Sequence, residues 1–216
     1  MVKVMKENAN ENTIKVKYDE SGLVPVVVQD YVSGEVLMLA YADERALRLT
    51  LESSELYLFS RSRGELWHKG ETSGNTMKIR HLCLDCDGDA VLVKVDPCGP
   101  ACHTGKRSCF FNDLTEEPKG DATFFGRLWR YLLKRKEADP MESYTARLIK
   151  EGPSRIAQKI GEEGVELAIA LALGDAKQVI YEASDLLYHI LVGLAAANVS
   201  LEEVWRELAS RHEGNH

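Results

Sequence analysis

The segment between Asp85 and Cys109 combines two kinds of metal ligand within a short stretch of chain. Its thiolates are soft donors that suit Zn²⁺, whereas its carboxylates are hard donors that suit Mg²⁺. Three thiolates leave one zinc position open, which is the pattern of a catalytic site where zinc converts water into hydroxide. The segment therefore predicts a metal-dependent hydrolase. The expected ligands are Cys86, Cys102 and Cys109 for zinc, and Asp85, Asp87 and Asp89 for magnesium.

The same residues also have an ordinary interpretation. A single cysteine is usually a small buried hydrophobic residue, and Asp-Gly sequences are common in turns. The clustering of the three cysteines with His103 favours zinc over that interpretation. If residues 85–89 are extended, alternation places the three aspartates on one face and Cys86 on the other. One backbone segment would then serve a soft and a hard metal site.

A second set of carboxylates occupies two segments of helical periodicity in the C-terminal half. Spacings of three and four residues place the members of each segment on one helix face. A run of charges is usually a solvated face, but the second segment lies among apolar residues, so we expect that helix to be largely buried. Facing carboxylates on two antiparallel helices would form a cage for Mg²⁺ holding a di- or triphosphate. The segments contain Glu162, Glu163 and Glu166, then Glu182 and Asp185, with His189 either beside them or satisfied in the core.

The elements that must position these ligands differ between the two halves of the chain. The first half alternates with the period of strands, and the second repeats with the period of helices. Strands are expected at residues 24–28, 35–39, 56–59, 77–82 and 90–95, with a turn at Ser33-Gly34 and one helix at 43–53. Helices are expected around residues 124–132, at 141–150, 154–173 and 175–197, and after a capping box formed by Ser200 and Glu203.

The change of period predicts an α+β protein of two domains. The strand-rich domain covers residues 13–111, and the helical-bundle domain covers residues 122–212. Residues 112–121 form the expected linker, because they contain Pro118 and Gly120 and little apolar content.

Composition limits the class of protein and its partners. A net charge of −7 argues against nucleic acid as a partner, since phosphate backbones require a basic surface. A small anionic substrate is compatible with this charge, because a bound divalent metal reverses the local field. Residues 1–12 are polar and show no signal peptide, and no apolar run reaches the length of a membrane span, so no membrane is expected. Thiolate ligands favour a reducing compartment, so we expect a cytoplasmic protein.

Both halves resemble known families. Residues 66–75, read together with residues 85–89 and 99–109, are similar to phosphoribosyl-AMP cyclohydrolase. The helical half is similar to phosphoribosyl-ATP pyrophosphohydrolase, one of the all-α nucleotide pyrophosphohydrolases. The motifs that carry the second similarity are residues 143–146, 161–163 and 182–189, with Glu166. Together the halves resemble the bifunctional enzymes of histidine biosynthesis over about residues 20–212.

The resemblance implies a role for individual residues. In the cyclohydrolase family the residue matching Cys86 comes from one subunit and those matching Cys102 and Cys109 come from its partner, which implies a homodimer with a shared zinc site. His103 would be a proton shuttle, and Lys69 a second catalytic group. The resemblance also assigns the aspartates to Mg²⁺ and makes Glu162, Glu163, Glu166, Glu182 and Asp185 the metal carboxylates of the pyrophosphohydrolase. Expected substrate contacts are Trp67, His68, Thr72, Ser73, Arg107 and Lys159.

The implied reactions follow one another. The helical half would cleave phosphoribosyl-ATP between the α and β phosphates and release pyrophosphate. The strand-rich half would open the purine ring of phosphoribosyl-AMP by attack of zinc hydroxide at C6 of the adenine. Two alternatives stay open at this point. The N-terminal half could be a non-catalytic zinc-held module closed by Cys98 or His103, and the helical half could be a general nucleotide pyrophosphohydrolase.

Overall fold

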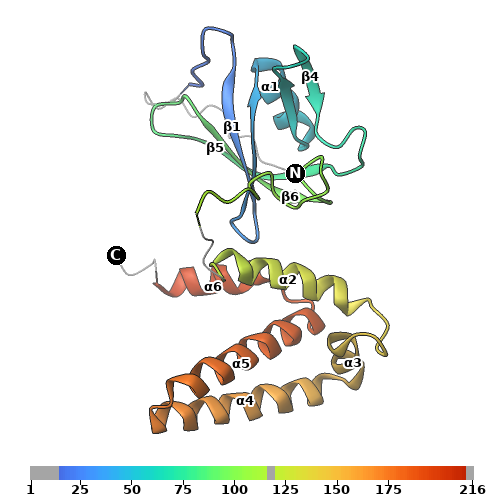
Figure 1. Cartoon of the computed structure of the whole chain (residues 1–216), viewed down its shortest axis with the longest axis vertical. Helices are drawn as coiled ribbons and strands as arrows, with labels where there is room; N and C mark the ends of the chain where they lie inside the picture. The colour runs from blue at the N-terminus through green and yellow to red at the C-terminus, as the bar shows by residue number, and fades with distance from the viewer. Residues whose placement is uncertain (1–14, 116–119, 213–216) are drawn as a thin grey trace. The chain divides into compact units, whose positions relative to one another are not determined.

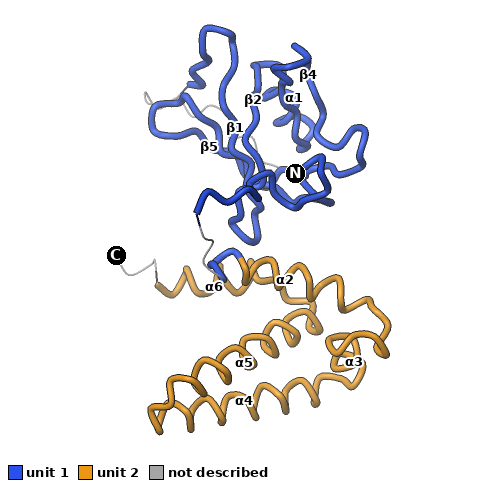
Figure 2. The backbone as a smooth tube through the Cα atoms, viewed as in Figure 1, with its two compact units in different colours: residues 1–123 blue, residues 124–216 orange. Residues whose placement is uncertain are grey.

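The protein is described by a computed structural model that covers residues 15–115 and 120–212. The chain divides into two compact units, residues 1–123 and 124–216 (Figure 2). The first is built on a six-stranded sheet and the second is helical, so the α+β class expected from the sequence is confirmed (Figure 1). Residues 1–12 and part of the expected linker at 112–121 lie outside the described residues.

The sheet of the first unit has the strand order β4-β3-β2-β1-β6-β5. Strands β1 and β6 are parallel neighbours, and the other described pairs are antiparallel. Helix α1 packs against strands β2, β3 and β4 (Figure 1). The element bounds are β1 Val24–Asp30, β2 Val36–Ala42, α1 Glu44–Ser53, β3 Tyr57–Ser60, β4 Glu65–His68, β5 Met77–Leu84 and β6 Val91–Pro97.

Alternation along β1 explains how this sheet builds its core. Val24, Val26, Val28 and Asp30 are fully buried, while the residues between them are partly exposed. Three of these positions join the apolar core, and the fourth carries a carboxylate at the end of the strand. The chain then reverses into β2 through the turn expected at Ser33-Gly34, where Gly34 adopts a left-handed conformation (φ 73°). The burial of β1 and the position of the turn into β2 are therefore determined by local sequence.

Two local expectations in this unit are wrong or incomplete. Strand β4 was not predicted, because it is a four-residue edge strand that pairs only with β3 among the described residues. Residues 85–89 are not extended but form a bend between β5 and β6. Gly88 has φ 82°, and the N–H groups of Gly88 and Ala90 donate to Asp85 Oδ1 at 3.0 and 3.1 Å. A turn, rather than strand alternation, therefore decides where the three aspartates point.

In the second unit, the described residues, which extend to residue 212, form five helices joined by short connections (Figure 1). Helix α4 ends at Gly174, whose φ is 70°, and Asp175 immediately caps α5 by accepting the N–H groups of Lys177 and Gln178 at 3.1 Å. This tight connection places α4 and α5 side by side in opposite directions. The bounds are α2 Thr123–Lys136, α3 Tyr144–Glu151, α4 Pro153–Leu173, α5 Ala176–Ala196 and α6 Leu201–His212.

The expected burial of α5 is wrong for its N-terminal half. Ile180 is 70% exposed and Tyr181 63% exposed, and the buried residues gather between His189 and Ala195. By length and hydropathy α5 also qualifies as a membrane span, contrary to the sequence expectation. Core helices that never meet a membrane pass the same test, and α5 packs along α4 within the helical unit. Its carboxylates therefore lie on an accessible part of a helix pair.

Candidate metal and substrate sites

A cavity of about 330 Å³ lies in the strand-rich unit beside the loop that follows β6. One wall comes from residues 67–75, at the end of β4 and after it, and the other from residues 100–109. The sequence-predicted site residues that line it are Trp67, Lys69, Thr72, Ser73, Cys102, His103 and Cys109. The structure thus brings two motifs that are separated in sequence into one concave site.

The thiols of Cys102 and Cys109 interact within this cavity. Thr104 Oγ1 donates to Cys102 Sγ at 3.1 Å, and this hydrogen bond is the main cause that lowers the pKa of Cys102. Desolvation, followed by the hydrogen bond with Cys102, raises the pKa of Cys109. The pair therefore offers one thiol whose pKa is lowered and one whose pKa is raised, and a bound cation would favour the thiolate form of both. Such a donor set suits a soft metal ion.

Lys69 places a buried positive charge beside the two thiols. The residue is only 6% exposed, and its Nζ donates to the carbonyl of Ala101 at 2.7 Å. The ammonium also lies 5.5 Å from the ring centre of Trp67. Desolvation lowers the pKa of Lys69, while the charges of Cys109 and Cys102 act in the opposite direction. Lys69 thus lines the cavity, and because its pKa is lowered it releases its proton more readily than an exposed lysine does.

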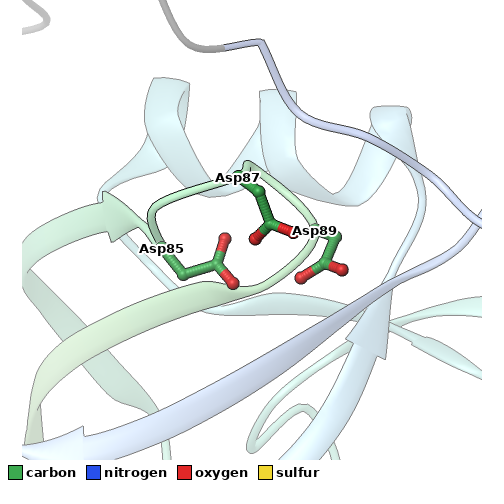
Figure 3. Close-up of side chains that lie close together, drawn as sticks. All are labelled: Asp85, Asp87 and Asp89. Carbon is green, nitrogen blue, oxygen red and sulfur yellow. The ribbon is translucent and has the colours of Figure 1, made fainter.

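The three predicted magnesium ligands converge at the bend after β5 (Figure 3). Asp85, Asp87 and Asp89 are exposed, and each offers a carboxylate oxygen within 4.8 Å of the others. The hydrogen bond with Asp85, then the charges of Asp87 and Asp85, raise the pKa of Asp89. For Asp85, desolvation favours a higher pKa, but hydrogen bonds, led by that from the Ala90 N–H, lower it overall. A divalent cation with oxygen ligands would relieve this crowding of like charges.

Cys86 lies in the aspartate bend rather than in the cavity. Its Sγ is 3.9 Å from Asp87 Oδ1, and the residue is exposed. Within the described residues, Cys86, Cys102 and Cys109 do not form a group close enough to hold one ion. The structure of one chain therefore supplies two of the three predicted zinc ligands to the cavity and leaves the third at an accessible bend.

In the helical unit, three carboxylates from α4 and α5 meet. Glu163, Glu166 and Glu182 each offer an oxygen within 4.8 Å of the others. Desolvation, followed by the charge of Glu166, raises the pKa of Glu182, and Asp185 adds to the effect. Asp185 is therefore nearby, although it does not belong to this group of three. The arrangement offers hard oxygen donors from two facing helices.

Glu162 is directed to other partners. Its carboxylate accepts hydrogen bonds from Lys159 Nζ at 2.9 Å and Gln158 Nε2 at 2.7 Å, and the bond from Lys159 is the main cause of its lowered pKa. Lys159 also lies 3.2 Å from Glu163 Oε1, and the bonds to Glu162 and Glu163 raise its pKa. The predicted substrate contact Lys159 thus sits directly beside the carboxylate cluster.

Three other residues singled out in the sequence have protein partners. His68 stacks on Tyr57, its Nε2 lies 2.8 Å from Glu55 Oε2, and it lies outside the cavity lining. Arg107 also lies outside the lining and binds two carboxylates described below. His189 is buried, with Nδ1 2.9 Å from the Asp185 carbonyl and Nε2 3.2 Å from the Tyr144 hydroxyl. These contacts match a satisfied core histidine, and His189 Nδ1 also lies 3.7 Å from Glu163 Oε1, so the residue is at the same time beside the carboxylate cluster.

The sequence did not single out every residue that acts on the predicted ligands or lines the cavity. Thr104 lies outside the cavity lining, but its hydrogen bond is the main cause that lowers the pKa of Cys102; a hydroxyl two residues after a predicted zinc ligand is the signal that could have identified it. Asn75 lines the cavity and ends the motif that was recognised. Its side chain lies against Gly99, where a Cβ would meet Asn75 Oδ1 at 2.1 Å. Gly99 therefore allows the two walls of the cavity to approach closely.

The described residues thus hold three metal-site candidates: the thiol pair of the cavity and the aspartate bend in the strand-rich unit, and the carboxylate cluster of the α4–α5 pair in the helical unit. Soft and hard donors beside open surfaces are the pattern of a metal-dependent hydrolase. Family models agree with this division. Residues 38–111 match phosphoribosyl-AMP cyclohydrolase, and residues 125–212 match phosphoribosyl-ATP pyrophosphohydrolase.

Curated relatives carry both halves in one chain. The histidine biosynthesis bifunctional protein HisIE of Caldanaerobacter subterraneus is 46% identical, over 92% of this chain and 97% of the relative. The protein of the same name from Bacillus subtilis is 45% identical, over 92% of this chain and 95% of the relative. The chain belongs to this family of bifunctional histidine-biosynthesis enzymes and contains a cyclohydrolase domain followed by a pyrophosphohydrolase domain.

Proposed function

We propose that the helical domain, residues 122–212, cleaves phosphoribosyl-ATP to phosphoribosyl-AMP and pyrophosphate, and that the domain at residues 13–111 then opens the adenine ring of phosphoribosyl-AMP. The observation that carries the proposal is the pair of interacting thiols beside a buried lysine in one cavity. A structural zinc site would have no need for an open cavity or for a lysine of lowered pKa. A cytoplasmic location would suit this function, because thiolate ligands stay reduced there.

The cavity residues fit a zinc ion by the chemistry of their donors. Cys102 and Cys109 would hold it together with Cys86. When bound, Zn²⁺ would supply a water-derived nucleophile at neutral pH for attack at C6 of the adenine. The exposed thiol Cys98 accepts a hydrogen bond from Thr76 and lies outside the cavity lining, so the proposal leaves the fourth zinc position open to the reaction.

The remaining polar groups of the cavity would bind substrate and move protons. Lys69, buried and of lowered pKa, would donate a proton to the ring nitrogen N1 as the N1–C6 bond breaks. His103 lies beside Cys102 and would accept a proton from the attacking water. Thr72 and Ser73 offer hydroxyl groups for the phosphates, and Trp67 offers an aromatic face for the adenine.

Completion of the zinc site would require a homodimer. Cys86 is exposed at its bend and does not reach Cys102 and Cys109 of its own chain. Across a two-fold axis the same patch is used twice, so each chain would give Cys86 to its partner's cavity and receive one in return. The aspartates beside Cys86 would bind Mg²⁺ close to the same boundary, where substrate phosphates need charge neutralisation.

In the helical domain, Glu163, Glu166 and Glu182 would hold Mg²⁺ against the triphosphate. The ion would neutralise the charge that develops between the α and β phosphates. Asp185 would join the cluster when the ion is bound, because it already raises the pKa of Glu182. Lys159, held by Glu162 and Glu163, would contact a phosphate at the edge of the cluster.

The test follows the two products separately on the full chain. Pyrophosphate release is measured with phosphoribosyl-ATP and with common nucleoside triphosphates, and ring opening is measured by absorbance with supplied phosphoribosyl-AMP. We expect ring opening of phosphoribosyl-AMP and a strong preference of the first reaction for phosphoribosyl-ATP. Equal cleavage of all triphosphates with no ring opening would instead identify a general pyrophosphohydrolase carrying a non-catalytic zinc-held module.

A further inference from the structure

Arg107 lies between Cys102 and Cys109 in the sequence, yet its side chain binds the β1–β2 hairpin. Its Nη2 donates to Asp30 Oδ2 at 2.7 Å, and its Nε donates to Glu35 Oε2 at 2.5 Å. The Asp30 side chain is fully buried, and that of Glu35 is 18% exposed. Charge pairs with this degree of burial have a defined geometry, unlike exposed pairs that exchange readily with water.

The hairpin end that receives Arg107 is itself fixed. The second oxygen of Asp30 accepts the backbone N–H groups of Val32 and Ser33, each at 2.9 Å. The Asp30 N–H donates to the Glu35 carbonyl at 2.8 Å, which closes the turn. One guanidinium therefore binds both ends of a single tight turn. A lysine could not reproduce this, because its ammonium is a point charge without the planar fork of arginine.

The backbone around Arg107 connects this anchor to both thiols. The Arg107 carbonyl accepts the Ala101 N–H at 3.0 Å, and the Cys102 N–H donates to the carbonyl of the residue before Arg107 at 3.1 Å. Cys109 follows two residues later, and its N–H donates to the Leu37 carbonyl at 2.8 Å. Residues 101–109 thus fold back on themselves and form two arms. Cys102 lies on the arm before the reversal, and Cys109 lies on the arm after it. Movement of Arg107 would change the separation of the two arms.

We propose that Arg107 is a positioning residue of the cyclohydrolase site: by binding Asp30 and Glu35 it holds Cys102 and Cys109 at the separation that a zinc ion needs. This role differs from the substrate contact expected from the sequence, since Arg107 does not line the cavity. The inference rests on the proposed zinc site. It makes the β1–β2 hairpin an outer support of that site, comparable to groups that orient metal ligands without touching the metal.

The test compares Arg107→Lys with Arg80→Lys in the full chain. Arg80 is a matched control, because its side chain is also 35% exposed, pairs with Asp96 and lies over the Tyr31 ring of the same β1–β2 hairpin, but it belongs to β5 and not to the loop that carries the two thiols. Zinc affinity is measured by competition with a chromogenic chelator, and thermal unfolding is followed on the metal-free protein. We expect Arg107→Lys to weaken zinc binding roughly 10–100-fold, as for other groups that orient metal ligands, and Arg80→Lys to leave it unchanged.

Kinetics separate positioning from substrate contact. Ring opening by Arg107→Lys should fall at limiting zinc and recover at saturating zinc with an unchanged KM for phosphoribosyl-AMP. Pyrophosphate release by the helical unit should stay constant in both variants. A raised KM with unchanged zinc affinity would overturn the inference in favour of a phosphate contact.

The remaining outcomes are a variant that does not fold, unchanged zinc affinity, and a chain that binds no zinc. If Arg107→Lys does not fold, Glu35→Gln removes the charge from the less buried anchor, and we expect a smaller weakening of zinc binding in the same direction. Unchanged zinc affinity in a folded variant would overturn the positioning role and leave the zinc site intact. Absence of zinc binding by the unmodified chain would instead overturn the proposed function itself, so the two failures are distinguishable.

Discussion

The position of Cys86 allows the shared zinc site to be tested by complementation between inactive subunits. Cys86→Ala and Cys109→Ala homodimers should each lack ring opening, because every site has lost one thiolate. In a heterodimer of the two, one site carries both lesions and the other carries none. Equal mixing with random assortment gives about half heterodimers, each with one intact site of two, so about a quarter of the unmodified activity should return.

The assay co-refolds the two variants with zinc and follows ring opening of phosphoribosyl-AMP per mole of protein. A mixture of Cys102→Ala with Cys109→Ala is the matched control, because these thiols line the same cavity and every site in that heterodimer stays damaged. It should show no recovery. If heterodimers demonstrably form and Cys86→Ala with Cys109→Ala remains inactive, the reasoning is refuted and each chain binds zinc alone.

Three further predictions concern the metal clusters. Glu182→Gln should lower pyrophosphate release on the order of 100-fold and leave ring opening intact, as expected when a metal-orienting carboxylate is lost. Asp185→Asn should lower pyrophosphate release less, because Asp185 lies outside the group of three. A zinc-selective chelator should stop ring opening before pyrophosphate release, and added Mg²⁺ should not restore it; equal loss of both activities would contradict segregated metals. Asp89→Asn should raise the melting temperature of the metal-free protein, because the raised pKa of Asp89 means that its charge costs stability as pH rises through that pKa. The same variant should lose the stabilisation that Mg²⁺ gives, and thermal unfolding with and without Mg²⁺ measures both effects.

Elements with local signals could be predicted from the sequence. The capping box is confirmed, since the Ser200 N–H donates to Glu203 Oε2 at 2.8 Å and the Glu203 N–H donates to Ser200 Oγ at 3.3 Å. The ends of α4 and the start of α5 are set by Gly174 and Asp175 as expected. Helix α3 begins at Tyr144 rather than 141, because Ser143 is its N-cap. In each case the deciding interaction spans only a few residues.

Features that depend on distant contacts could not be predicted in the same way. Strand β4 exists because β3 offers it a partner, not because its four residues alternate strongly. The sequence placed Asp85, Asp87 and Asp89 on one strand face, but hydrogen bonds within a bend bring them together. Glu162 lies outside the helical cluster, and its carboxylate accepts hydrogen bonds from Lys159 and Gln158. A sequence motif therefore does not by itself determine the geometry in which its side chains meet.

The acidic character of the chain has a consequence for how its substrates bind. The protein carries a net charge of −7, and both carboxylate clusters gather further negative charge where phosphates are proposed to bind. Without cations these clusters would repel a triphosphate. Repulsion within each cluster also contributes to the raised pKa values: the charges of Asp87 and Asp85 act on Asp89 after the hydrogen bond with Asp85, and the charge of Glu166 acts on Glu182 after desolvation. Bound Mg²⁺ reverses the sign of the local field. The metal ions would therefore admit the substrate as well as activate it, which links substrate affinity to Mg²⁺ concentration in the helical domain.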